Sequence, residues 1–146
     1  MTTANVATRP GNGAVDCGGA NVRAHCRHLA TVVSIRGDID AVNVDRVSEY
    51  IRRFIHGGNP IVLDLSGVNL FAMAGISLLH LVDEECRAAG VEWTLVASPA
   101  VVELLADGYD EDMFPFTRSV HEALRNLAEA IVSRRQLVLP LIKKTA

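Results

Sequence analysis

The sequence predicts a single α/β domain with a mostly parallel central sheet, an antiparallel hairpin at its start and about four helices. Hydrophobic residues form 49% of the 146 residues and charged residues 21%, a balance typical of one globular domain with its own core. Two segments with strand character come first, and helical and strand patterns then follow one another along the chain. This order favours parallel pairing of the later strands.

The chain is expected to begin with a flexible arm. Residues 1–20 contain four glycines, four alanines and one proline but no apolar period, so burial could not offset the entropy lost on ordering them. A weak pattern over residues 22–29 and the alternation of Val33 and Ile35 with polar neighbours then predict two strands joined as a hairpin.

A helix and a buried strand are expected next. Apolar residues recur mostly three and four positions apart from Val44 to Ile55, opposite a charged face, and the glycines at 57 and 58 end this helix. The continuous apolar run from Ile61 to Leu63 suits a central strand that is covered on both faces. Asp64 and Ser66 mark the expected end of this strand.

The alternation continues to the last helix. We expect a helix over 75–89, a strand over 93–97, a helix over 99–106, a strand over 114–117 and a helix whose start carries the capping pair Ser119 and Glu122. The folded domain is thus expected over residues 21–133. Residues 134–146 form a tail, interrupted by Pro140, that packs back on the domain or reaches a partner.

Charge and hydropathy argue against two classes of partner. Fourteen basic and seventeen acidic side chains give a formal charge of −3, whereas binding to nucleic-acid phosphates favours a basic face. The uncharged stretch 65–82 is too short and too polar to span a membrane, and the tail has too few lysines for firm anchoring. We therefore expect neither a nucleic-acid partner nor membrane insertion.

The three cysteines indicate a reducing cytoplasm and no metal site. Cys17, Cys26 and Cys86 are odd in number and lack the spacing of a disulfide framework or a zinc knuckle. His25 and His28 would point to opposite faces of a strand, so they could not share a metal ion. Cys86 lies on an apolar helix stripe and is expected to be inert core.

The sequence indicates no enzyme. The common signatures of hydrolases, phosphate-binding loops, zinc proteases and dinucleotide-binding folds are all missing, and no pair of carboxylates stands out by its spacing. We therefore expect no catalytic residues, no cofactor and no metal.

Two motifs resemble one family. The segment Leu63-Asp64-Leu65-Ser66-Gly67-Val68 leads into Ala72-Met73-Ala74-Gly75, and Gly37-Asp38-Ile39-Asp40 precedes it by one amphipathic helix. Both resemble the STAS domain of sulfate transporters and bacterial anti-sigma factor antagonists, which reads Gly-Glu-Leu-Asp at the first place and Leu-Asp-Leu-Ser-Gly-Val followed by Asp-Ser-Ser-Gly at the second. The resemblance covers roughly residues 22–131 and implies the same order of strands and helices.

The resemblance implies a non-enzymatic regulator, an anti-sigma factor antagonist that binds a serine-kinase-type anti-sigma factor and thereby releases a sigma factor. A small-ligand-binding or scaffolding STAS module of a transporter or signalling complex is the alternative. The identity of the partner, the sigma factor, the upstream signal and the oligomeric state are left open by the sequence.

The chain departs from the family at the regulatory serine. The second serine of Asp-Ser-Ser-Gly accepts the phosphate that blocks partner binding in the family, and that position is Ala74 here. A methyl group cannot accept a phosphate, so the resemblance implies an antagonist without its usual switch. If the loop is exposed, its apolar side chains offer a docking patch; alternatively, Phe71 and Met73 turn into the core. The expected partner-binding residues are Asp38, Asp40, Phe71, Ala72, Met73, Ala74 and Gly75.

Overall fold

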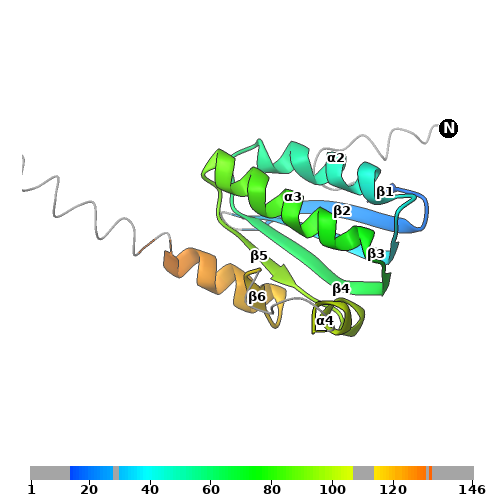
Figure 1. Cartoon of the computed structure of the whole chain (residues 1–146). Helices are drawn as coiled ribbons and strands as arrows, with labels where there is room; N and C mark the ends of the chain where they lie inside the picture. Colours follow the sequence, from blue (N-terminus) through cyan, green and yellow to red (C-terminus); the bar gives the residue numbers. More distant parts are fainter. Residues whose placement is uncertain (1–13, 28–29, 107–113, 131, 133–146) are drawn as a thin grey trace, which may run out of the picture.

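A six-stranded mixed sheet forms the centre of the computed structural model, which describes residues 14–27, 30–106, 114–130 and 132 (Figure 1). The strands are β1 (Ala14–Asp16), β2 (Ala20–Arg27), β3 (Ala30–Ile39), β4 (Ile61–Phe71), β5 (Trp93–Val96) and β6 (Phe116–Thr117). The helices are α2 (Val44–Ile55), α3 (Ala74–Ala89) and α4 (Pro99–Ala106), and residues 120–130 are also helical.

The strands lie side by side in the order in which they occur in the sequence. β1, β2 and β3 pair antiparallel, whereas β3, β4, β5 and β6 pair parallel. The prediction of a mostly parallel sheet that starts with an antiparallel hairpin is therefore confirmed. The parallel strands place the start of α2 and the start of α3 at the same edge, because each helix follows the carboxyl end of its strand.

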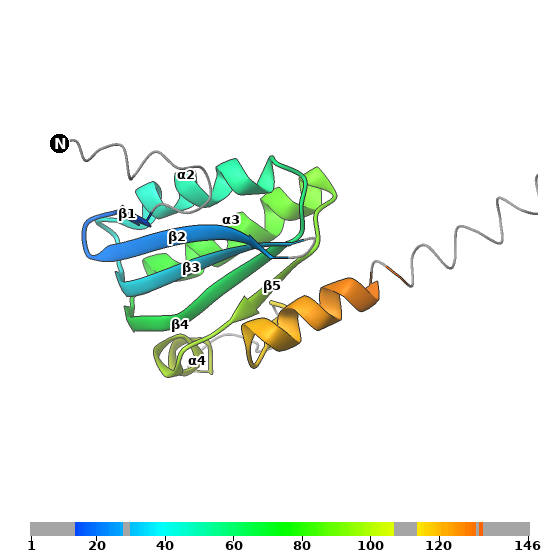
Figure 2. The ribbon, with the colours of Figure 1, turned by 180° about the vertical axis from the view of Figure 1, so that it is seen from behind.

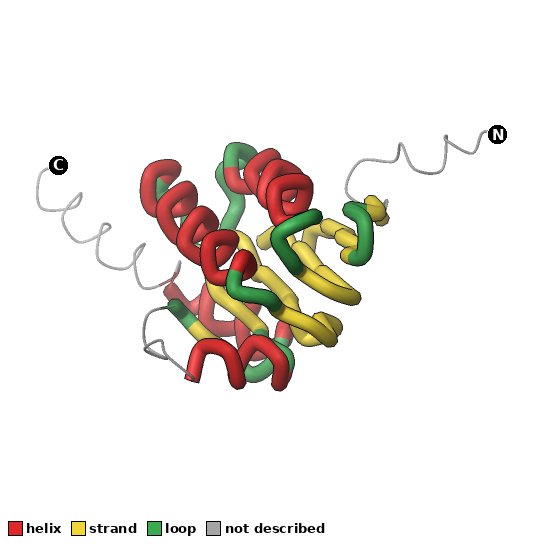
Figure 3. Tube along the Cα trace, turned by 45° about the vertical axis from the view of Figure 1, so that its right-hand side comes forward, coloured by secondary structure: helices red, strands yellow, loops and turns green. Residues whose placement is uncertain are grey.

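Helices cover the two faces of the sheet unequally (Figures 1 and 3). α2 and α3 lie together over one face, where Val47, Ile51 and Leu79 join the main core with Ile35 and Leu63 from the strands. A smaller cluster lies on the reverse face. It consists of Ala30, Val32, Val62 and Val96 with Ala123 and Leu127 from the last described helix.

Capping residues end and start the helices where the sequence predicts. Gly90 follows α3 with a φ of 69°, the left-handed conformation that glycine adopts without steric cost. The Ser98 hydroxyl accepts from the Val101 amide at 3.4 Å, and Pro99 opens α4. Ser119 accepts from the Glu122 amide at 3.1 Å, which confirms the predicted start of the last helix.

The predicted end of the strand at Asp64 and Ser66 is wrong, because β4 continues to Phe71. Its pairing with β3 shifts register twice, between Ser34 and Arg36 and between Gly37 and Asp38. Each shift places an extra β4 residue in the ladder, so the core-facing side chains are spaced two, three and three apart. They are Leu63, Leu65, Val68 and Phe71. This spacing hides the strand from a search for period-two alternation.

The flexible arm expected over residues 1–20 is too long, because its last residues belong to the folded domain. Residues 14–16 form β1, and Cys17 is buried in the turn that leads to β2. The Cys17 amide donates to the Ala20 carbonyl at 2.7 Å, which closes this turn. Gly18 and Gly19 both have positive φ and allow the chain to reverse direction tightly. In the sequence, these glycines and the lack of an apolar period are also typical of a flexible segment, so the pattern alone does not reveal the turn. Residues 1–13 and the expected tail 134–146 lie outside the described residues.

The single tryptophan anchors the end of the sheet opposite the starts of α2 and α3. Trp93 is 8% exposed and begins β5, and its indole N–H donates to Asp83 Oδ1 of α3 at 3.0 Å. Its ring meets the Phe114 ring edge-on at a centroid distance of 6.2 Å. These contacts join α3, β5 and the segment before β6.

Substitution of Gly37 should be much more damaging than substitution of Gly58. Both have positive φ, +100° and +86°, but a Cβ at residue 37 would overlap the Gly19 carbonyl oxygen, whereas nothing lies within 4 Å of one at residue 58. We expect Gly58→Ala to lower the free energy of unfolding by about 1–2 kcal/mol, the cost of the left-handed conformation alone. Gly37→Ala should cost at least about 3 kcal/mol by urea unfolding. Equal losses would contradict the close approach of β3 to the turn at Gly19.

Candidate functional site

The carboxyl edge of β3 and β4 brings the two sequence motifs together. Asp38 pairs with Leu70 and Ile39 with Phe71 in the parallel ladder. The Ala72 amide then donates to the Ile39 carbonyl at 2.9 Å, so the loop before α3 lies directly beside the loop before α2. Motifs that are one helix apart in the sequence thus form one continuous edge.

Asn43 ties three segments together at this edge. Its side chain is 1% exposed, and its amide nitrogen donates to the carbonyls of Gly18 at 3.0 Å and Asp38 at 2.8 Å. Its amide oxygen accepts from the Asp40 backbone N–H at 3.0 Å. One buried side chain therefore joins the turn before β2, the end of β3 and the start of α2.

The two expected aspartates have different surroundings. One carboxylate oxygen of Asp40 accepts from the backbone amides of Val42 at 2.9 Å and Asn43 at 3.2 Å, so this side chain shapes the turn before α2. Asp38 is half-buried, and its backbone amide donates to the Gly19 carbonyl at 2.9 Å. Among the described contacts, the Asp38 carboxylate has no hydrogen bond that shapes a turn as the Asp40 carboxylate does.

Phe71 belongs to the core and explains the glycine that follows it. The Phe71 side chain is 7% exposed, and a Cβ at residue 75 would overlap its ring. Gly75 therefore lets the first turn of α3 pack directly on the phenyl ring. Of the two alternatives left open for this loop, Phe71 takes the inward one.

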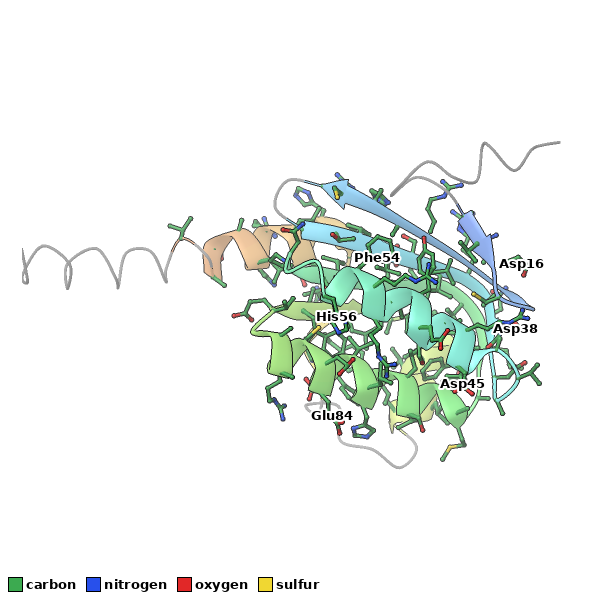
Figure 4. All side chains as sticks on the ribbon, turned by 90° about the horizontal axis from the view of Figure 1, so that it is seen from above. Asp16, Asp38, Asp45, Phe54, His56 and Glu84 are labelled. Atoms are coloured by element: carbon green, nitrogen blue, oxygen red, sulfur yellow. The ribbon has the colours of Figure 1, made fainter. Side chains whose placement is uncertain are left out.

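Met73 takes the outward alternative, and two other exposed apolar side chains lie on neighbouring segments of the same edge. The exposed fractions are 59% for Met73, 50% for Leu70 and 86% for Val42. We name these three residues and the adjoining Ala72 and Ala74 the docking edge. Asp38 and Asp45 border the same end of the molecule together with Asp16, as Figure 4 shows from above.

The hydroxyl groups near the docking edge lie at other positions. Ala74 is half-buried at the first residue of α3 and has only a methyl group. Ser66 is exposed within β4 and donates its hydroxyl to Asp64 at 2.6 Å. Ser77 is exposed one turn into α3. Neither serine occupies the position of Ala74.

The described residues contain no cluster of histidine, cysteine and carboxylate side chains that could hold a metal ion. His25 is half-buried and Cys26 exposed in β2, while His28 lies outside the described part of the chain. Cys86 is fully buried in α3, which confirms its predicted position in the core, and this burial raises the pKa of its thiol to about 12. No described helix has the length and apolar character needed to cross a membrane.

Sequence reasoning missed three residues of this site. Asn43 directly precedes the apolar stripe of α2, a position typical of a helix-capping residue, and this was the signal that could have identified it. Its side-chain amide does not cap the helix, however, but donates to the Gly18 carbonyl in the turn before β2. Val42 falls outside the helix, and Leu70 is turned outward only because β4 shifts register twice. A period-based search assigns neither side chain to a surface.

Comparison with known proteins finds a matching family model and a close relative. The model described as the STAS domain matches residues 21–123. Osmosensory protein A of Mycobacterium tuberculosis is 63% identical to this chain, and the aligned region covers 97% of this chain and 92% of that protein.

Solved structures with the same fold include two anti-sigma factor antagonists. The protein from Mycobacterium paratuberculosis superposes with a TM-score of 0.67 at 23% identity, covering 73% of this chain and 92% of that one. The antagonist SpoIIAA in its unphosphorylated form superposes with a TM-score of 0.61 at 14% identity, covering 74% and 96%. At these identities the likeness concerns the fold.

Removal of the Asn43 amide should loosen the docking edge and destabilise the protein. Asn43→Ala leaves two carbonyls and one N–H without their partner, so we expect the free energy of unfolding to fall by about 2–3 kcal/mol. Asn69→Ala, at an exposed position of β4, is the matched control and should change it by less than about 0.5 kcal/mol. Urea unfolding measures both. A loss at Asn43 no larger than at Asn69 would show that water replaces these hydrogen bonds without cost.

Proposed function

The chain belongs to the STAS domain family, and we propose that it acts as an anti-sigma factor antagonist without the phosphorylation switch of that family. In this proposal it binds a serine-kinase-type anti-sigma factor in the cytoplasm through the docking edge and so releases a sigma factor for transcription. It acts by occupying its partner, and it catalyses no reaction. The name of its 63% identical relative supports a role in the response to osmotic change.

The observation that carries the proposal is the composition of the docking edge. Three exposed apolar side chains, Val42, Leu70 and Met73, lie where the two family motifs meet. Exposed apolar groups that gather at one place mark interaction sites more often than scattered ones do. The acidic side chains of Asp38 and Asp45 lie at the same end of the molecule (Figure 4), so the docking edge suits a partner surface with apolar residues at its centre and basic residues around them.

The loss of the switch has a physical basis in Ala74. A phosphoserine at the start of α3 would carry nearly two negative charges, and a docking partner would have to remove their water. Ala74 cannot impose that cost, so the affinity for the partner would be independent of kinase activity. Control would then have to come from the amount of this protein or from another part of the complex.

A capture experiment from native lysate tests the proposal. Wild-type protein and Met73→Asp serve as two baits, with lysates prepared before and after an osmotic shift, and mass spectrometry identifies what each bait retains. We expect an anti-sigma factor that the wild type retains and the variant does not. Retention of transporter components instead would favour the alternative of a scaffolding module, and identical retention by both baits would contradict the docking edge.

Met73→Asp should weaken partner binding without weakening the fold. Met73 is 59% exposed at the N-terminus of α3, and the first turn of this helix has no acidic residue. An aspartate at position 73 would therefore interact favourably with the positive end of the helix dipole. We expect partner affinity to fall by more than about 1 kcal/mol in calorimetry while the melting temperature stays constant or rises slightly. Val102→Asp, an exposed apolar position on α4, is the matched control and should leave affinity unchanged. A large fall in the melting temperature of Met73→Asp would place this side chain in the core.

Rebuilding the family motif should install the missing switch. The triple variant Ala72→Asp, Met73→Ser, Ala74→Ser restores Asp-Ser-Ser-Gly before α3, and Ala74→Ser alone lacks the neighbouring carboxylate. We expect the kinase to label the triple variant efficiently, the single variant poorly and the wild type not at all at residue 74. Labelled ATP and mass spectrometry measure this.

The phosphorylated triple variant should then lose its partner, while the wild type stays bound at every ATP concentration. The variant carrying Ala72→Asp and Met73→Ser but keeping Ala74 is the control for the two substitutions themselves. Full phosphorylation with undiminished binding would show that the start of α3 is not in the interface.

A further inference from the structure

The reverse face of the sheet is divided into an apolar half and a polar half. The apolar half, with Val32, Val62 and Val96, lies under Ala123 and Leu127 of the last described helix. The polar half lies toward the carboxyl ends of β3 and β4, and no described helix covers it when the sheet is seen from behind (Figure 2). This second region adjoins the docking edge at Leu70, but its residues are not part of that edge and are not used by the proposed function.

A cavity of about 400 Å³ opens on the polar half. Ser34 and Arg36 of β3 line it with Asp64, Ser66, Gly67 and Asn69 of β4. The register shifts between the two strands occur within this set of residues. Such irregularities redirect side chains and occur often beside functional sites. Its volume lies in the range of small-molecule sites.

Neighbouring groups fix the carboxylate at the cavity. Asp64 Oδ1 accepts from the Ser66 hydroxyl at 2.6 Å and from the Ser66 backbone N–H at 3.0 Å. Asp64 Oδ2 accepts a longer bond from the Ser34 hydroxyl at 3.4 Å. The negative charge is thereby held in one place before any ligand arrives, which lowers the entropic cost of binding.

A glycine makes room for the guanidinium stem. The ladder places Arg36 opposite Gly67, and a Cβ at residue 67 would lie 2.8 Å from Arg36 Cγ. Only a residue without a side chain lets the stem of Arg36 lie this close to β4. The cavity therefore holds one fixed acidic group and one cationic group from adjacent strands.

No ion pair of the described residues joins these two opposite charges. The ion pairs of the described residues join Arg52 and His56 to Glu85 and Arg87 to Asp83, and none joins Arg36 to Asp64. A free anion would be attracted by Arg36 but repelled by Asp64, and a free cation would meet the reverse. A molecule that carries both charges satisfies both groups at once.

We propose that this cavity binds a small zwitterion of the amino-acid or betaine class. Arg36 receives the carboxylate of the ligand in a charge-assisted hydrogen bond, and Asp64 receives its cationic group. Ser34, Ser66 and Asn69 supply polar contacts around the two charges. A nucleotide does not fit this chemistry, because its phosphates would lie next to Asp64. The site belongs to this chain whether or not the docking edge binds an anti-sigma factor.

Calorimetric titration of the full chain tests the site with four probes. Glycine betaine carries two fixed charges and L-proline can also donate hydrogen bonds, while acetate and methylammonium each carry one half of the zwitterion. We expect saturable binding of glycine betaine or L-proline with a Kd on the order of 1 mM, and at least about tenfold weaker binding of both halves. Absence of saturation with both zwitterions, or acetate binding equal to theirs, would overturn the proposal.

Three variants locate the binding. Arg36→Met and Asp64→Asn each remove one charge, and Gly67→Ala pushes the Arg36 stem away without changing any charge. Each should weaken zwitterion binding at least tenfold. Arg53→Met, an exposed arginine of α2, is the matched control and should bind as the wild type does. Far-ultraviolet circular dichroism and melting curves identify any variant that fails to fold. Binding that survives both Arg36→Met and Asp64→Asn would place the ligand elsewhere and contradict this site.

Discussion

The pairing of β3 with β4 is the constraint on which both proposed binding surfaces depend. These strands are parallel neighbours at the centre of the sheet, and their ladder shifts register twice over its length. The shifts let Leu65, Val68 and Phe71 keep facing the core although they are not spaced by two. They also turn Leu70 outward at the carboxyl edge and place Ser66 and Asn69 around a cavity on the reverse face. A regular ladder would provide neither surface.

Rigidity at the docking edge comes from buried polar and aromatic contacts beneath it. Asn43 holds the turn before β2 and the end of β3, while the Phe71 ring lies against Gly75 under the first turn of α3. The exposed side chains above them therefore stand on a fixed backbone. A preorganised surface loses less conformational entropy on binding, so a patch of three apolar side chains can contribute more than its area suggests.

Periodicity alone was enough for most of the fold and for only part of the site. The apolar stripe of α2 and the alternation in β3 could be predicted from the sequence, because each element buries a single regular face. The strand β1 and the second half of β4 did not, since two glycines resemble a linker and two register shifts break the period. The resemblance predicted partner-binding residues at Asp38, Asp40 and residues 71–75, but only the structure shows that Phe71 points inward and Met73 outward. Asn43 acts through contacts distant in sequence, which no local pattern encodes.

The position of Trp93 gives the molecule a natural optical reporter. Trp93 is the only tryptophan, so its fluorescence emission shifts to the red when unfolding exposes the core to water. Because its indole is buried and hydrogen-bonded to Asp83, this fluorescence is sensitive to loss of packing. Trp93 also stands beside the first residue of β4, whereas Met73 follows the last residue of that strand, so the two lie at opposite ends of the sheet. Fluorescence therefore separates two kinds of event without any label. A ligand that merely occupies the far edge leaves the emission unaltered, whereas one that changes it has transmitted a rearrangement through the strands.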